Sequence, residues 1–126
     1  PPDPILTKFL GLGAEASTDS RTLNGNACSA GEITGTAKVV LSLDESDKLE
    51  PGDIMVCPMT MPPWTPLFGI VGAVVADAGG VLSHCAIVAR EYGIPCVAGT
   101  RTGTQAIKDG MTIRVDGTAG TVEIIG

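Results

Sequence analysis

The chain has very few of the residues on which catalytic and metal sites usually depend. His84 is its only histidine, and only four of its 126 residues are aromatic. Its four cysteines, Cys28, Cys57, Cys85 and Cys96, form no Cys-x-x-Cys pair. This spacing argues against a paired-thiol redox protein, and with a single histidine it makes a zinc site improbable. We expect no metal site, and we expect the cysteines to be reduced thiols in a cytoplasmic protein.

Long apolar runs and basic clusters are also missing. No apolar run reaches the ~18 residues of a membrane span, and no signal peptide is visible. The formal net charge is −6, and no group of lysines and arginines could neutralise phosphates, so neither nucleic acid nor an anionic membrane is an expected partner. No P-loop and no metal-binding carboxylate cluster is present. At 126 residues the chain has room for one core, which is small for a complete two-substrate kinase.

What is present is a series of short apolar segments separated by glycine and proline, with a βαβ rhythm that predicts the α/β class. Residues 1–22 show no sustained hydrophobic periodicity and are predicted to be a linker or the edge of a preceding domain. Residues 23–126 are predicted to form the domain itself. Strands are expected at 24–30, 33–41, 54–57, 72–76 and 96–98, and a hairpin at 112–115 and 121–125. Helical segments are expected at 42–48, 66–71, 104–108 and from His84 to Gly93.

The segment that contains the histidine is the most informative. Gly79 and Gly80 precede Ser83, a favourable N-cap residue, so His84 should lie at or beside the first helical position. Gly93 supplies the stop at the other end. An imidazole placed there can carry an anionic adduct facing backbone N–H groups and the positive helix end, and a phosphoryl group is the obvious anion.

Several neighbours could support such an adduct. Gly79 and Gly80 would let the backbone approach a phosphate without a Cβ clash. Thr60 and Ser83 could donate hydrogen bonds to phosphoryl oxygens, although turn and capping roles explain both equally. Arg90 could bind phosphate.

Two of these assignments have structural alternatives. Arg90 could instead pair with an acidic neighbour such as Glu91 or Asp77. Cys85, directly after the histidine, could be a reactive thiol, but we favour a small packing residue.

Three stretches also resemble a known family. Residues 79–99 resemble the phosphohistidine signature of the mobile domain of phosphoenolpyruvate (PEP)-utilising enzymes. Residues 60–68 are similar to its Thr-x-Pro-x-Trp-Thr-Pro-Leu-Phe stretch, and residues 26–37 to its opening segment, with Ala30 where proline is usual. Leu82 stands where many members have Thr, Ser or Asn. The overall pattern is most similar to the rifampicin phosphotransferase, phenylphosphate synthase and phosphoenolpyruvate synthase types.

The resemblance implies a three-layer β/β/α swivelling domain that acts as a phosphocarrier. It implies that His84 accepts a phosphoryl group from ATP and passes it to a small-molecule acceptor, a phosphotransferase reaction that this domain would not complete alone. It further implies that ATP and Mg²⁺ bind a separate ATP-grasp domain, that the acceptor binds another domain, and that this domain holds no cofactor. The alternative is a non-catalytic interaction or regulatory module that kept the fold.

Overall fold

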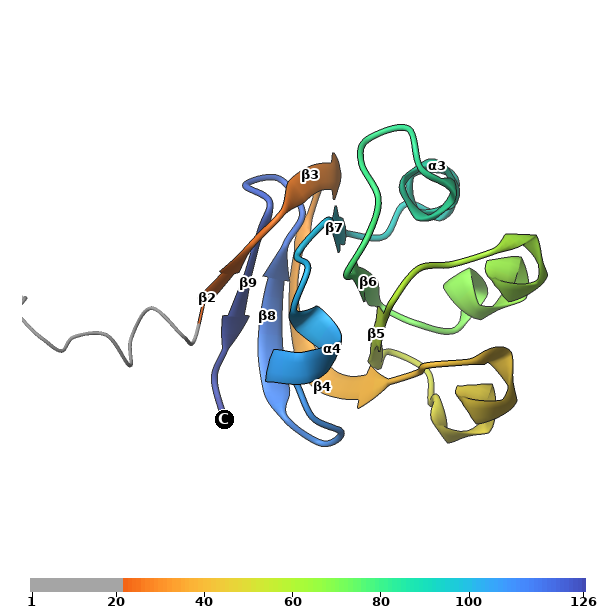
Figure 1. Cartoon of the computed structure of the whole chain (residues 1–126), viewed down its shortest axis with the longest axis horizontal. Coiled ribbons are helices and arrows are strands. Elements are labelled where there is room, and N and C mark those ends of the chain that lie inside the picture. The colour runs from red at the N-terminus through yellow and green to blue at the C-terminus, as the bar shows by residue number, and fades with distance from the viewer. Residues whose placement is uncertain (1–21) are drawn as a thin grey trace, which may run out of the picture.

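A computed structural model describes residues 22–126 (Figure 1). The linker predicted for residues 1–22 lies outside them, except for Thr22, which begins the first described strand. The elements, in chain order, are β2 (Thr22–Asn24), β3 (Asn26–Ser29), β4 (Glu32–Val39), the 3₁₀ helix η1 (Leu43–Lys48), β5 (Ile54–Cys57), the 3₁₀ helix η2 (Pro62–Gly69), β6 (Ala73–Ala76), α3 (His84–Tyr92), β7 (Cys96–Ala98), α4 (Gly103–Ala106), β8 (Thr112–Asp116) and β9 (Thr121–Ile124).

The strands form an antiparallel sheet and a mixed sheet, and β4 belongs to both. The order of hydrogen-bonded neighbours across the two sheets is β2-β9-β8-β4-β5-β6-β7-β3. The first residues of β4, 32–36, pair antiparallel with β8, and its last, 37–39, pair parallel with β5. Strands β5, β6 and β7 are parallel to one another, and β3 closes that sheet as an antiparallel edge. Because β4 changes partners along its length, the antiparallel sheet packs against one face of the mixed sheet, as Figure 1 shows.

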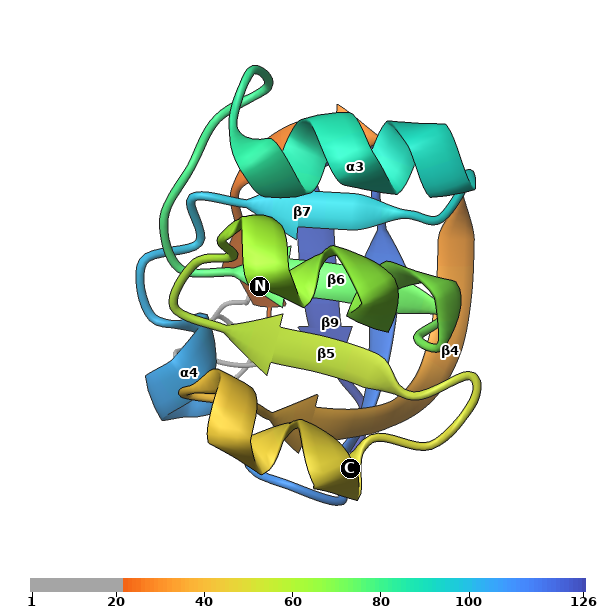
Figure 2. The same cartoon turned by 90° about the vertical axis from the view of Figure 1, so that its right-hand side faces the viewer.

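The other face of the mixed sheet is covered by α3, η2 and η1, which lie across β7, β6 and β5 (Figure 2). Strand β5 shows how the sequence builds these layers, since alternate side chains of a strand point to opposite faces. Ile54 and Val56 belong to the core between the sheets, whereas Met55 and Cys57 belong to the core beneath the helices. The predicted three-layer β/β/α architecture is confirmed.

Most predicted elements are confirmed, including the buried strands β5 and β6 and the hairpin of β8 and β9, in which Asp116 pairs with Thr121. The strand expected at 24–30 is divided at Gly25, where a Cβ would lie 2.5 Å from the Ala98 carbonyl oxygen. The helix expected at 104–108 is displaced to Gly103–Ala106.

The helix predicted at 66–71 was wrong in type and position. The segment is the 3₁₀ helix η2, which begins at Pro62 and contains Pro66 in its interior. Proline has no N–H, so Pro66 interrupts any α-helical ladder. The segment instead forms short turns on either side of Pro66. The backbone N–H of Trp64 donates a hydrogen bond to the carbonyl of Met61, and that of Ile70 donates to the carbonyl of Leu67. Among residues 22–126 no helix has the length and apolar character to cross a bilayer.

Candidate active site

His84 is the first residue of α3, as predicted, and its side chain is half-buried. Ser83 is the N-cap residue in extended conformation, and Gly93 ends the helix with φ of 72°. The N–H of Gly93 donates to carbonyls of the last turn, which is the left-handed cap expected for glycine. The imidazole therefore lies at the positive end of the helix dipole.

Three side chains from the segment after β5 surround the imidazole. Thr60 Oγ1 lies 2.7 Å from Nδ1, and Thr65 Oγ1 lies 3.3 Å from Nε2. The ring of Phe68 packs edge-on against the imidazole, with centroids 6.2 Å apart and an interplanar angle of 85°. Thr60 is only 4 % exposed, so its hydroxyl holds Nδ1 from the protein interior.

The imidazole lines a largely apolar cavity of about 260 Å³ between this segment and the start of α3. Three of the predicted support residues, Thr60, Gly79 and Ser83, also line it, whereas Gly80 and Arg90 do not. The remaining lining residues are Met59, Met61, Pro62, Ala78 and Cys85.

The loop 79–83 has a conformation that requires glycine at its first position. Gly79 has φ of 116°, and a Cβ there would lie 2.9 Å from Ser83 Oγ. Ser83 does not cap the helix with its side chain, because its hydroxyl donates instead to the Gly80 carbonyl at 2.7 Å. The Asn26 side chain donates to the Gly79 carbonyl at 3.0 Å, which ties the loop to β3.

Arg90 lies away from the imidazole cavity and contacts backbone. Its guanidinium donates to the carbonyl of Cys28 at 2.6 Å and to that of Val81 at 2.7 Å. These contacts tie α3 to β3 and to the loop before the helix. They replace the suggested ion pairs, and Asp77 instead accepts hydrogen bonds from the backbone N–H and hydroxyl of Thr104.

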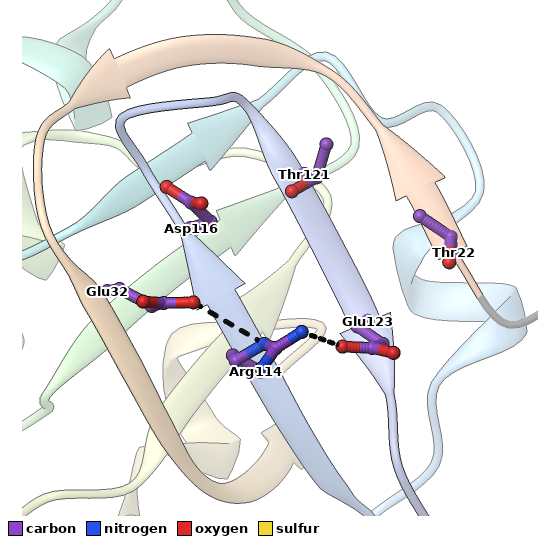
Figure 3. Close-up of a pocket in the computed structure, with 6 residues that line it drawn as sticks. All are labelled: Thr22, Glu32, Arg114, Asp116, Thr121 and Glu123. Carbon is purple, nitrogen blue, oxygen red and sulfur yellow. Dashed lines mark hydrogen bonds and ion pairs between the residues drawn. The ribbon is translucent and has the colours of Figure 1, made fainter.

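A second depression, of about 250 Å³, lies on the antiparallel sheet (Figure 3). At its centre Arg114 forms ion pairs with Glu32 and Glu123, so its charge is already compensated. The full lining is Thr22, Glu32, Arg114, Asp116, Thr121 and Glu123. Within residues 22–126, no cluster of three or more His, Cys, Asp or Glu side chains could hold a metal ion.

Comparison with known proteins identifies this arrangement. Residues 49–120, which include His84, Thr60, Thr65 and the loop 79–83, match the family model described as PEP-utilising enzyme, mobile domain. The chain belongs to this family.

Similar proteins agree with this assignment. The mobile domain is 47 % identical to a rifampicin phosphotransferase of Bacillus subtilis, over 79 % of this chain and 11 % of that protein. It is 46 % identical to a phosphoenolpyruvate synthase of Aeropyrum pernix, over 79 % of this chain and 12 % of that protein. A solved structure of an Enzyme I protein aligns with a TM-score of 0.56 and 32 % identity, covering 64 % of this chain and 33 % of that one. The chain therefore spans a small part of these proteins.

Sequence reasoning missed three residues of the mobile domain that the structure brings to the site. Thr65 contacts Nε2, Phe68 packs edge-on against the imidazole, and Asn26 holds Gly79 from β3. The position of Thr65 within the stretch 60–68, after the carboxyl end of a buried strand, was the only available signal for it. Asn26 had no such signal, because its partner is 53 positions away in the sequence.

Proposed function

We propose that the chain is a phosphocarrier in which His84 accepts a phosphoryl group from ATP and passes it to a small-molecule acceptor. The observation that carries this proposal is the half-buried imidazole at the start of α3, with Nδ1 held by a buried hydroxyl 2.7 Å away. Because Thr60 occupies Nδ1, the reacting atom is Nε2. The similarity to phosphotransferases and phosphoenolpyruvate synthases favours this role over a non-catalytic module.

The chemistry requires a neutral imidazole with a free nitrogen lone pair. Nε2 attacks the phosphorus of the donor, the bond from phosphorus to the leaving nucleotide oxygen breaks, and a phosphoramidate forms. Positive charge develops on the ring as the new bond forms. A hydrogen bond from Nδ1–H to Thr60 Oγ1 disperses that charge and fixes the ring orientation. The Thr65 hydroxyl, 3.3 Å from Nε2, is placed to donate to a phosphoryl oxygen.

The positive end of α3 adds to this stabilisation of the phosphoryl oxygens. Gly79 supports the adduct indirectly, by giving loop 79–83 the conformation from which the helix begins.

The surroundings of His84 support docking on another protein surface. Leu82, in the loop before α3, is 82 % exposed, and Met59, Met61 and Val81 are about half exposed. Apolar side chains in such a position favour a closed contact that excludes water from the phosphoryl group. We propose that the surface belongs to an ATP-grasp domain that binds ATP and Mg²⁺, and that an acceptor-binding domain receives the phosphoryl group. We also propose that the mobile domain itself holds no cofactor and works in the cytoplasm.

The test uses the chain, the nucleotide-binding domain of the enzyme to which it belongs, and ATP labelled in turn on the β- or γ-phosphoryl group. We expect acid-labile label on the mobile domain from one of the two. Because His84 is the sole histidine, any phosphohistidine in this chain identifies it. His84→Asn should remove the label, whereas Tyr92→Phe, at the far end of α3, should retain it. A wild-type chain that stays unlabelled while the nucleotide-binding domain turns over ATP would overturn the proposal.

A further inference from the structure

Two side chains from outside the loop before α3 hold its backbone. The side-chain amide of Asn26, on β3, donates to the carbonyl of Gly79 at 3.0 Å. The guanidinium of Arg90, on α3, donates to the carbonyl of Val81 at 2.7 Å and to that of Cys28, on β3, at 2.6 Å. The segment projects as a loop between β6 and α3 (Figure 2), and these contacts tie it to β3 and to the helix.

The loop also bonds to itself between these two contacts. The carbonyl of Gly80 accepts hydrogen bonds from the Ser83 hydroxyl at 2.7 Å and from the Ser83 backbone N–H at 3.0 Å. The carbonyls of residues 79–81 are therefore all hydrogen-bonded, which restricts the conformations open to this backbone. Because Ser83 is the N-cap of α3, the same contacts determine where the helix begins and where His84, the next residue, lies.

The loop that follows β7 leaves room for the Asn26 contact. Gly99 has φ of 72°, and a Cβ there would lie 2.7 Å from the Asn26 side-chain nitrogen and 2.9 Å from the Gly79 carbonyl oxygen. Glycine at this position allows both the positive φ and the close approach. The hydrogen bond between Asn26 and Gly79 is therefore part of a closely packed junction between β3, the loop before α3 and the end of β7.

The contact between Thr60 and the imidazole depends on where this loop places the start of α3. Thr60 lies in the segment after β5, and its Oγ1 is 2.7 Å from His84 Nδ1. The two partners come from separate segments, so only the tertiary structure sets the distance between them. Hydrogen bonds weaken steeply as their geometry departs from the preferred values, so a shift of the first turn of α3 would loosen the ring. Phosphoryl transfer is sensitive to such a shift, because it depends on accurate placement of the attacking atom.

We propose that Asn26 and Arg90 are positioning residues for phosphoryl uptake: by holding loop 79–83 they keep His84 in contact with Thr60. This inference rests on the proposed phosphocarrier function. Neither side chain lines the cavity that contains the imidazole, and the Arg90 guanidinium is already bonded to two carbonyls. Both residues therefore act on the loop and make no contact with the phosphoryl group.

The first measurement is the rate of phosphoryl uptake. The 126-residue chain is incubated with phosphoramidate, a small donor that requires no partner domain, and the adduct is followed by intact mass. In this reaction Nε2 bonds to phosphorus, the P–N bond of the donor breaks, and its protonated amino group leaves as ammonia. We expect Asn26→Ala and Arg90→Gln each to react at least about fivefold more slowly than the wild type. Arg90→Lys keeps the positive charge but lacks the planar fork that reaches two carbonyls, so it should restore only part of the rate.

Two matched controls exclude a general effect of substitution. Arg114→Gln removes an arginine that forms two ion pairs on the antiparallel sheet, and Asn24→Ala removes an exposed asparagine on β2. Both should keep the wild-type rate. Thermal unfolding gives a temperature at which every variant is folded, and all rates are compared there. If Arg90→Gln fails to fold, Asn26→Ala, at an exposed position, decides the matter.

The second measurement observes the imidazole directly. His84 is the sole histidine, so its two ring nitrogens give the only imidazole signals in a ¹⁵N NMR spectrum. At about pH 8, where an imidazole is ordinarily neutral, the contact with Thr60 should hold the wild-type ring in one tautomer, with the proton on Nδ1. In Asn26→Ala and Arg90→Gln the two nitrogen shifts should move toward the average of the two tautomers. A loss of stability alone would not change these shifts in the folded protein.

The outcomes separate the positioning role from the phosphocarrier function. Wild-type rates and ring shifts in folded Asn26→Ala and Arg90→Gln would overturn the proposal. Slower uptake with unchanged ring shifts would overturn it as well, because the effect would then not pass through the imidazole. A wild-type chain that takes up no phosphoryl group, either from phosphoramidate or from ATP with the nucleotide-binding domain, would instead refute the phosphocarrier function. The ring shifts would still show whether Asn26 and Arg90 position His84.

Discussion

Replacing Thr60 by valine tests the central contact of the site. Valine keeps the shape of threonine but removes the hydroxyl that lies 2.7 Å from His84 Nδ1. Thr60 is buried, so water has little access to take over the lost bond. We expect Thr60→Val to slow phosphorylation of His84 because the imidazole loses the group that fixes its orientation and its tautomer.

The size of the effect follows from the contact. Losing one buried hydrogen bond of this kind costs about 1–2 kcal/mol. If the cost falls on the transition state, the rate constant decreases about 5- to 30-fold. Thr65→Val should slow phosphorylation less than Thr60→Val does, because the contact of Thr65 Oγ1 with Nε2, at 3.3 Å, is longer than that of Thr60 Oγ1 with Nδ1, at 2.7 Å.

The assay is phosphoryl uptake followed by intact mass, with the phosphorylated nitrogen assigned by NMR. Wild type should carry the phosphoryl group on Nε2, and Thr60→Val should react more slowly and with some modification at Nδ1. Thermal unfolding of both proteins separates a loss of reactivity from a loss of fold. Phosphorylation of the wild type at Nδ1, or an unchanged rate in a folded Thr60→Val, would refute the reasoning.

Two further predictions concern the fold around the site. Arg90→Gln should lower the free energy of unfolding by about 1–2 kcal/mol and increase hydrogen exchange in loop 79–83, because two charge-assisted bonds to backbone carbonyls are lost. Glu91→Gln is the matched control, and equal exchange in both variants would contradict the role given to Arg90. The hydrogen bond that Asp109 accepts from the Val39 backbone N–H is the largest cause that lowers the pKa of this carboxyl group. The ammonium group of Lys48 lowers the same pKa further. Asp109 therefore stabilises the fold above its ordinary pKa of about 4, and this is lost as the pH falls through the lowered value. Asp109→Asn should reduce the melting temperature at about pH 7, and the loss should shrink steadily as the pH falls below about 4; an equal loss at about pH 7 and about pH 2 would disprove this.

The parts of the fold that the sequence predicted are those that depend on neighbouring residues. The segments 54–57 and 72–76 predicted strands buried on both faces. The structure has β-strands at Ile54–Cys57 and Ala73–Ala76, with every residue of both buried. Ser83 and Gly93 predicted the two ends of α3, because capping depends on residues next to the helix ends. The same logic failed at Pro66, where proline fits the first turn of an α-helix equally well and the preceding Pro62–Pro63 had already begun a 3₁₀ helix.

In the candidate site, too, the features that the sequence predicted are those that depend on neighbouring residues. His84 and the glycine-containing turn before it were identifiable from the sequence, since all lie within one short segment. The partners of the imidazole were only partly identifiable. Thr60 was named as a candidate hydrogen-bond donor to a phosphoryl group, but its contact with Nδ1 was not predicted, and Thr65 was assigned no role. The backbone partners of Arg90 had no local signal, because Cys28 lies 62 positions away.

The sequence by itself determined the family, the position of the histidine at a helix start and the alternation of strands and helices. Only the tertiary structure decided which hydroxyl holds which imidazole nitrogen, that Arg90 binds carbonyls, and that the four cysteines belong to one core cluster. The physical reason is the sequence separation over which the interactions act. Caps, turns and strand periodicity are set by interactions over a few residues, whereas these contacts depend on the order of strands in the sheet and on how α3 and η2 pack across it.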